Sequence, residues 1–299
     1  MMMWYSKYAI LSIYAQKELP MLRIVTDTAS DITLAQAEAL GVDMVSLEIT
    51  FEDGPCPQST EEDFRIFYER LSRCSELPVT SRPAPDSYLR IFLDAKAKGE
   101  EVLVLSVSSG LSGTIESAFT AKGMAEYDKI TIVDTQQAIL TQRMLVEYAV
   151  QLRQEGHDAA SITEKVVEMS KNLVVCGVVG TLKYLRKGGR IPASLAVVGS
   201  MLHIKPVIVL EDGILKTLGK ARGHAAGLGL LQKRIEADGV NTAYPVYFGY
   251  TSDKTLTQQA MEKFSQQYGW DHTRMHAIGG IIGTHCGTDC VAVAYVKNN

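Results

Sequence analysis

One segment, residues 108–114 with the sequence SSGLSGT, combines hydroxyl side chains with glycines directly after an apolar run. Small residues let a backbone approach a ligand closely, and the free N–H groups at the start of a helix favour an anion. The pattern therefore predicts that the Ser112 hydroxyl and neighbouring amides hold a phosphate or a carboxylate. A tight turn between a strand and a helix, without a ligand, explains the same residues equally well.

Ser112 is also a candidate nucleophile, and the residues around it test this alternative. The turn that exposes a catalytic serine in many hydrolases has the pattern G-x-S-x-G. Residues 110–114 have the sequence GLSGT, in which the second glycine comes one position too early. The hydrolase turn is therefore not matched.

Residues 80–86, with the sequence TSRPAPD, present two hydroxyl groups beside two prolines. Proline favours an extended backbone, so Thr80 and Ser81 are presented to a ligand instead of being absorbed into a helix. The alternative interpretation is an ordinary capped loop.

A third segment, residues 282–290, surrounds His285 with glycines in the sequence IGTHCGTDC. An imidazole can donate a hydrogen bond from either nitrogen, which suits an anion. The adjacent His285 and Cys286 lack the spacing of common metal sites, and Cys290 begins an apolar strand. We therefore expect a Gly-rich loop that contacts an anion, and no metal.

Two basic loops complete the candidate sites, at residues 183–190 (KYLRKGGR) and 219–223 (GKARG). A glycine next to an arginine can expose the guanidinium to a phosphate or a partner protein. A solvated turn accounts for either loop as well.

The first half of the chain supplies a framework for these segments. Apolar runs at 22–25, 102–107 and 130–133 alternate with helix patterns, which predicts a parallel sheet with helices on both faces. The alternation of apolar residues at 45–51 predicts a half-buried strand. Ser59 and Glu62 have the spacing of a capping box ahead of a helix.

The second half has a different pattern. Two helices, at about 138–154 and 159–171, precede it, and two apolar runs then flank EDG at 211–213, which is a hairpin signal. We expect two α/β domains: an N-terminal domain at 21–170, and a smaller C-terminal domain at 171–299 with a mixed or antiparallel sheet. Residues 1–20 are expected to be an extension outside the fold.

Composition excludes several classes of function. The 299 residues are 46% hydrophobic and carry a net charge of −4 without a long basic run, which argues against disorder and against nucleic-acid binding. The five scattered cysteines suggest reduced thiols in a cytoplasmic protein. No window has the length of a membrane helix, and neither a P-loop nor a dinucleotide-binding fingerprint is present.

In this order, the segments resemble those of the DegV family of bacterial fatty-acid-binding proteins. The matching pieces are TDTASD at 26–31, residues 80–83, 108–114, 180–190, the hairpin at 205–222 and GTH at 283–285. The resemblance implies two α/β domains with a fatty acid in the first, the second closing the site. It also implies a carrier without catalytic activity, which serves a separate ATP-dependent fatty acid kinase.

The resemblance further assigns roles to individual residues. It implies that Thr80, Ser112, Gly113 and His285 bind the fatty acid carboxylate, and that Arg222 contacts the kinase or its phosphate. It implies no cofactor besides the bound fatty acid.

The sequence departs from the family's pattern at two places. Gly287 is followed by Thr288 and Asp289 where Gly-Pro-Gly is common, and Thr28 replaces a usual serine. Asp289 adds a negative charge near the expected carboxylate. Two alternatives stay open: a serine acyl hydrolase or transferase using Ser112 and His285, and a phosphate-binding module.

Overall fold

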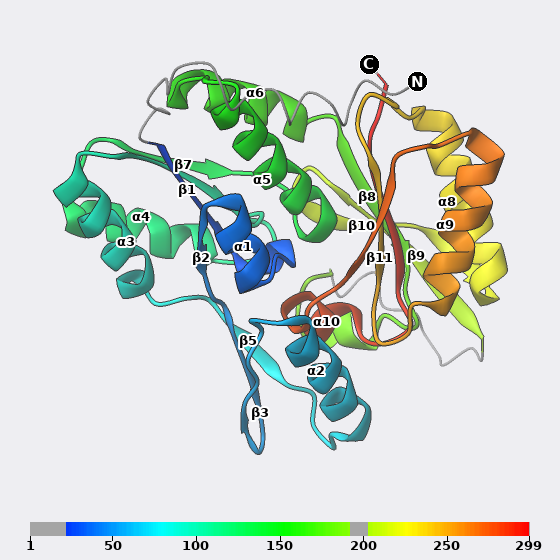
Figure 1. Ribbon diagram of the computed structural model, residues 1–299. Coiled ribbons are helices and arrows are strands. Elements are labelled where there is room, and N and C mark those ends of the chain that lie inside the picture. Colours follow the sequence, from blue (N-terminus) through cyan, green and yellow to red (C-terminus); the bar gives the residue numbers. More distant parts are fainter. Residues whose placement is uncertain (1–21, 192–202, 299) are drawn as a thin grey trace.

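The computed structural model describes residues 22–191 and 203–298, so the extension expected at 1–20 lies outside the described residues. Two large sheets lie on either side of the helices α5 (Ile139–Gln154) and α6 (Ala159–Ser170) (Figure 1). These helices confirm the two predicted at 138–154 and 159–171. None of the helices in the described ranges is long and apolar enough to cross a membrane.

The first large sheet is parallel, as predicted. Its strands lie in the order β2 (Val42–Val45), β1 (Leu22–Asp27), β6 (Glu101–Ser106) and β7 (Ile130–Asp134). Successive side chains of a strand point to opposite faces. Ile24 therefore packs with the α5 side, whereas Val25 and Val104 pack with α3 (Pro85–Lys98) and α4 (Thr114–Ala125). Helices thus cover both faces of this sheet.

The second large sheet is mixed and has six strands. Their order is β10 (Ile214–Arg222), β9 (Ile204–Glu211), β8 (Leu173–Val178), β13 (Val291–Val296), β11 (Val246–Tyr250) and β12 (Thr273–Ala277). The predicted hairpin is confirmed as β9 and β10, and only β11 and β12 pair in parallel. One face packs against α8 (Gly223–Asp238) and α9 (Thr255–Tyr268) through Val174 and Phe264. The other face turns toward α5.

A third, small sheet was not predicted. It consists of β4 (Gly54–Pro55), β3 (Glu48–Phe51) and β5 (Val79–Ser81), beside α2 (Glu61–Arg73). The alternating apolar residues at 45–51 are buried as expected, but they do not form one strand. Between β2 and β3 the Leu47 amide donates to Thr28 Oγ1 at 3.0 Å, so the chain leaves one sheet and enters another.

The cap of α2 lies one residue later than predicted. Thr60, and not Ser59, is the N-cap: its Oγ1 accepts a hydrogen bond from the Asp63 amide at 3.1 Å. The Asp63 carboxylate accepts from the Thr60 amide in return, at 2.9 Å. Asp63 thus closes the box in place of Glu62, because a carboxylate at the third helical position can reach back to the N-cap amide.

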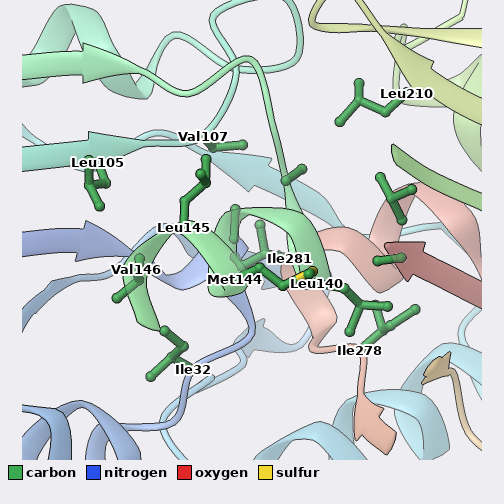
Figure 2. Close-up of a cluster of buried hydrophobic side chains, with 14 of the residues drawn as sticks. Ile32, Leu105, Val107, Leu140, Met144, Leu145, Val146, Leu210, Ile278 and Ile281 are labelled. Carbon is green, nitrogen blue, oxygen red and sulfur yellow. The ribbon is translucent and has the colours of Figure 1, made fainter. Parts of the chain in front are cut away.

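One hydrophobic core is shared by the two large sheets (Figure 2). Residues of this core are Ile32, Leu105, Val107, Leu140, Met144, Leu145, Val146, Leu210, Ile278 and Ile281. Because α5 contacts β1 and β6 of one sheet and β8, β11 and β13 of the other, the core continues across the middle of the chain. The domain division near residue 170 stays a prediction.

Candidate functional site

A largely apolar cavity lies between the two large sheets, beside the short helix α10 (Gly280–Cys286). Its apolar wall includes Leu47, Val107, Ala138, Val175, Ile208, Leu210, Leu215, Ile278, Ile281 and Ala292. The space between the walls, together with its opening to solvent, is about 870 Å³. Both halves of the chain contribute to this wall.

Four polar side chains line this apolar cavity: Thr80, Ser112, Arg190 and His285, here called the polar cluster. Three of them, Thr80, Arg190 and His285, also line a second hollow, whose walls include Tyr184 and Lys187. These three side chains therefore lie between the apolar cavity and the second hollow, whereas Ser112 lines the apolar cavity alone. A ligand with an apolar tail and an anionic head would fit this arrangement.

Thr80 and His285 are 205 residues apart in the sequence but meet at the cavity. Thr80 belongs to β5, and its Oγ1 lies 3.0 Å from His285 Nε2. The Nδ1 edge of the ring faces Gly188, where a Cβ atom would stand only 2.2 Å from this nitrogen. The bare backbone of Gly188 and the Thr80 hydroxyl thus fix the ring at both edges.

His285 lies in the last turn of α10, so the Gly-rich loop predicted there is wrong. Glycines disfavour a helix in isolation, but tertiary packing overrides this preference. Residues 183–190 likewise form the short helix α7 (Lys183–Lys187) followed by a glycine turn, and not only a loop.

Ser112 lines the cavity from the segment between β6 and α4. Its Oγ lies 2.8 Å from Thr114 Oγ1 and accepts a hydrogen bond from the Thr114 amide at 3.3 Å. Gly113 is the N-cap of α4 but is not among the lining residues. A Cβ atom on Gly113 would meet only the ends of the exposed Glu116 and Arg82 side chains, which are free to move aside. The predicted role of the Gly113 amide in ligand binding stays a prediction.

The charge of the polar cluster comes from Arg190, because His285 is neutral. Burial, and secondly the positive charge of Arg190, lower the pKa of His285 to about 4. A neutral imidazole offers one donor and one acceptor nitrogen, so His285 can still donate one hydrogen bond to an anion. Among the described residues, its buried Nδ1 has no hydrogen-bond partner.

Arg190 is the functional candidate that the sequence analysis did not place at the cavity. Its Nε donates to the Leu111 carbonyl at 3.0 Å, and its Nη1 donates to the Gly188 carbonyl. Burial lowers its pKa from the usual value. Gly189 adopts a φ of +70° just before it, which suits glycine. The paired glycines at 188–189 were the only sequence signal for this turn.

Arg222 and Asp289 do not line the cavity. Arg222 is exposed at the end of β10, so its predicted contact with a partner stays a prediction. The Asp289 carboxylate accepts a hydrogen bond from Lys205 and lies 3.1 Å from His224 Nε2. The negative charge that Asp289 adds is therefore paired with Lys205, away from the residues that line the cavity. Within the described ranges, no cluster of three potential metal ligands is found.

Comparison with known proteins gives matches along nearly the whole chain. The family model described as "Uncharacterised protein, DegV family" matches residues 21–298. A DegV domain-containing protein of Halalkalibacterium halodurans is 30% identical over 277 residues, covering 92% of this chain and 98% of that protein.

Solved structures also match the chain over nearly its whole length. A DegV lipid-binding protein of Thermotoga maritima has a TM-score of 0.81 at 25% identity, covering 93% of this chain and 99% of that one. A DegV family protein of Thermus thermophilus, described with fatty acid binding, has a TM-score of 0.81 at 26% identity, covering 92% and 99%.

Proposed function

The chain belongs to the DegV family, and from this premise we propose that it binds one long-chain fatty acid in the apolar cavity. The carboxylate would lie at the polar cluster, with the acyl chain along the apolar wall. The observation that carries this proposal is the apolar cavity with its four polar side chains beside a second hollow. The lipid and fatty acid binding described for the Thermotoga and Thermus proteins supports it.

Tail and head make different contributions to this binding. Burying roughly fifteen methylenes at about 0.8 kcal/mol each contributes on the order of 12 kcal/mol before ordering costs. A hydrogen bond to a charged group contributes only about 1.5–3 kcal/mol. The tail therefore supplies most of the affinity, and the polar cluster decides which end of the ligand is presented to the second hollow.

The polar cluster is suited to a carboxylate. Arg190 offers the positive charge that compensates a buried anion, and the hydroxyls of Thr80 and Ser112 are donors for its oxygens. His285 contributes a donor without adding charge, since burial and Arg190 keep its ring neutral near pH 7.

The protein would act as a carrier for a separate enzyme. We propose that an ATP-dependent fatty acid kinase phosphorylates the bound carboxylate: a carboxylate oxygen attacks the terminal phosphorus of ATP, and ADP leaves. The second hollow, with Lys187 in its wall, offers a cationic side chain next to the carboxylate position. Arg222 is proposed to contact the kinase, and the cytoplasm, which holds ATP, is the expected location.

The hydrolase alternative needs Ser112 and His285 to share a hydrogen bond. In the structure, the Ser112 hydroxyl pairs with Thr114, and the His285 ring pairs with Thr80. A module for simple phosphates would not need the long apolar wall. The carrier function accounts for both the polar cluster and this wall.

The test compares the wild type with Ser112→Ala, His285→Ala and the control Ser109→Ala. Ser109 is an exposed residue of the same segment, bonded to Asp134 and absent from the cavity wall. Fatty acid affinity is measured by titration, and acyl phosphate is measured after adding kinase and ATP. We expect the two cluster variants to bind about tenfold more weakly and to lose acyl phosphate, while the control matches the wild type.

Wild-type behaviour of both cluster variants would contradict the proposal. A fluorophosphonate probe separates the carrier from the hydrolase, because it labels activated serines covalently. We expect Ser112 to stay unlabelled, and a covalent adduct at Ser112 would favour the hydrolase.

A further inference from the structure

The segment TDTASD at 26–31 contains two buried carboxyl groups, Asp27 and Asp31, that the proposed binding does not use. Asp27 is 0% exposed and Asp31 is 2% exposed. They flank the single turn η1 (Thr28–Ser30), which follows the end of β1. Two carboxylates buried this completely are rare in proteins unless they have partners, and their partners are backbone amides.

Asp31 holds the start of α10. Its Oδ1 accepts a hydrogen bond from the Gly279 amide at 2.9 Å, and Gly279 is the N-cap of the helix that carries His285. Its Oδ2 is buried without a partner among the described residues. Asp31 has a φ of +55°, a conformation that Asp, Asn and Gly tolerate best.

Two side chains from another part of the chain also form hydrogen bonds with the backbone at the start of α10. The Gln58 side-chain oxygen accepts from the Gly280 amide, and the Tyr68 hydroxyl donates to the Ile278 carbonyl at 2.8 Å. Asp31 is the carboxyl among these three contacts. Without its Oδ1, the buried Gly279 amide would lose its acceptor, and leaving a buried donor unpaired is energetically costly.

Asp27 has the matching role on the other side of the cavity. Its Oδ2 accepts from the Val107 amide at 2.8 Å, and its Oδ1 accepts from the Ala29 amide at 3.1 Å. Val107 directly precedes the segment that carries Ser112. The two ends of one turn therefore hold the backbone that leads to Ser112 and the backbone that leads to His285.

We infer that Asp31 is a positioning residue for the fatty acid carboxylate: by fixing the Gly279 amide, it sets where α10 holds His285 relative to the Ser112 segment, which Asp27 fixes. This inference rests on the proposed function, because it gives the TDTASD segment a role in presenting the ligand's head. Asp31 does not line the cavity, so its effect is transmitted through α10.

The test measures affinity for hexadecanoic acid and for 1-hexadecanol, using the full chain stripped of lipid, at one pH. The acid tests the polar cluster, whereas the alcohol tests mainly the apolar wall. Asp31→Gly removes the acceptor without backbone strain, Asp31→Asn keeps an acceptor, and Thr33→Ala is the control. Thr33 caps α1 (Leu34–Leu40) in the same part of the chain, and the hydrogen bonds of its side chain and amide go to Gln36 and not to α10.

We expect Asp31→Gly to lower the affinity for the acid about tenfold and to leave the affinity for the alcohol within about twofold. Asp31→Asn, which keeps an acceptor for the Gly279 amide, should retain most of the wild-type preference for the acid over the alcohol. Thr33→Ala should change neither affinity, although losing the cap lowers its stability. A purely structural role for Asp31 would weaken both ligands equally, and that result would overturn the inference.

A spectroscopic measurement covers the case in which Asp31→Gly does not fold. In wild-type protein, adding the acid should shift the amide signal of Gly279 together with the ring signals of His285, and adding the alcohol should shift neither. A Gly279 signal that the acid leaves unmoved would overturn the inference. If the wild type does not prefer the acid to the alcohol, the proposed function fails. If the wild type prefers the acid and Asp31→Gly prefers it equally, the inference about Asp31 fails and the proposed function stands.

Discussion

The charge of the polar cluster, and of the two carboxyl groups that hold its backbone in place, depends on how burial shifts the pKa of single side chains. Burial, and secondly Arg190, keep His285 neutral, so Arg190 alone supplies positive charge to the cluster near pH 7. Burial acts in the opposite direction on the carboxyls behind it, raising the pKa of Asp27 to about 6 and that of Asp31 to about 7. The carboxyls that hold the site are therefore costly to ionise, and stability must depend on pH.

Asp31→Asn should make the protein less sensitive to pH between 5 and 7. The pKa of Asp31 rises from 3.8 to about 7 on folding, so the folded state binds this proton more tightly than the unfolded chain. The free energy of unfolding therefore falls as pH rises through this window, and levels off above about pH 7. Asn does not titrate, so the free energy of unfolding of the variant should rise relative to that of the wild type as pH increases to 7. Urea unfolding at several pH values measures this difference.

Other groups that face Asp31 do not explain such a difference. Burial raises the pKa of Tyr68 on α2, and the contact with Cys290, followed by burial, raises the pKa of Cys286 on α10. Both groups therefore keep their protons between pH 5 and 8. The guanidinium of Arg143 on α5 also faces Asp31 and donates a hydrogen bond to its carbonyl. A constant difference between variant and wild type across pH 5–8 would contradict the raised pKa of Asp31.

Residue types in the sequence pointed to part of the candidate site. Thr80, Ser112 and His285 all line one cavity. They could be predicted as candidates because each stands beside a turn or glycine signal in the sequence. Arg190 could not be placed there, since only the positive φ of Gly189 turns the guanidinium back to Leu111. Carboxylate binding by these residues stays a prediction until a ligand is measured.

Among the elements, α10 depends most on tertiary packing. It contacts α2, α7, β5 and η1, and its glycines lie directly against aromatic rings of α2. A Cβ atom on Gly283 would stand 2.6 Å from the Tyr68 hydroxyl and 2.7 Å from the Phe67 ring. The helix therefore needs glycine for close approach, and the small third sheet with α2 serves to position both Thr80 and His285.

A pair of glycine substitutions tests this packing. Gly283→Ala in α10 should lower the free energy of unfolding by about 1–3 kcal/mol, because the added methyl group has no room. Gly123→Ala in α4 is the matched control: nothing lies within 4 Å of the added Cβ, so the better helix former should stabilise by about 0.5–1 kcal/mol. Urea unfolding measures both, and two changes of the same sign would contradict the account of α10.

Elements with strong local patterns were predictable, and elements formed by distant partners were not. The parallel strands, the β9–β10 hairpin and helices α5 and α6 followed from apolar runs, turn residues and helix periodicity. The strands β4, β5 and β12 are short or half-exposed, so they lack such a pattern. The helix α10 was missed because its glycines are explained only by the rings of α2.

At the scale of the whole molecule, the cavity exists because the two large sheets share one core. Val107 enters the wall from the first sheet's side, and Val175 and Leu210 enter it from the second sheet. The sequence predicted both sheets but not that α5 would contact strands of each. The expected assignment of the acyl chain to the N-terminal domain, with the C-terminal domain closing the site, stays a prediction.

Native mass spectrometry of the protein as purified, followed by denaturing release and lipid analysis, tests fatty acid binding most directly. We expect an added mass that resolves into one fatty acid per chain, and the released lipid would identify the preferred acyl chain. Protein that is empty as purified, and that takes up no fatty acid when it is offered, would show that the cavity does not bind fatty acid.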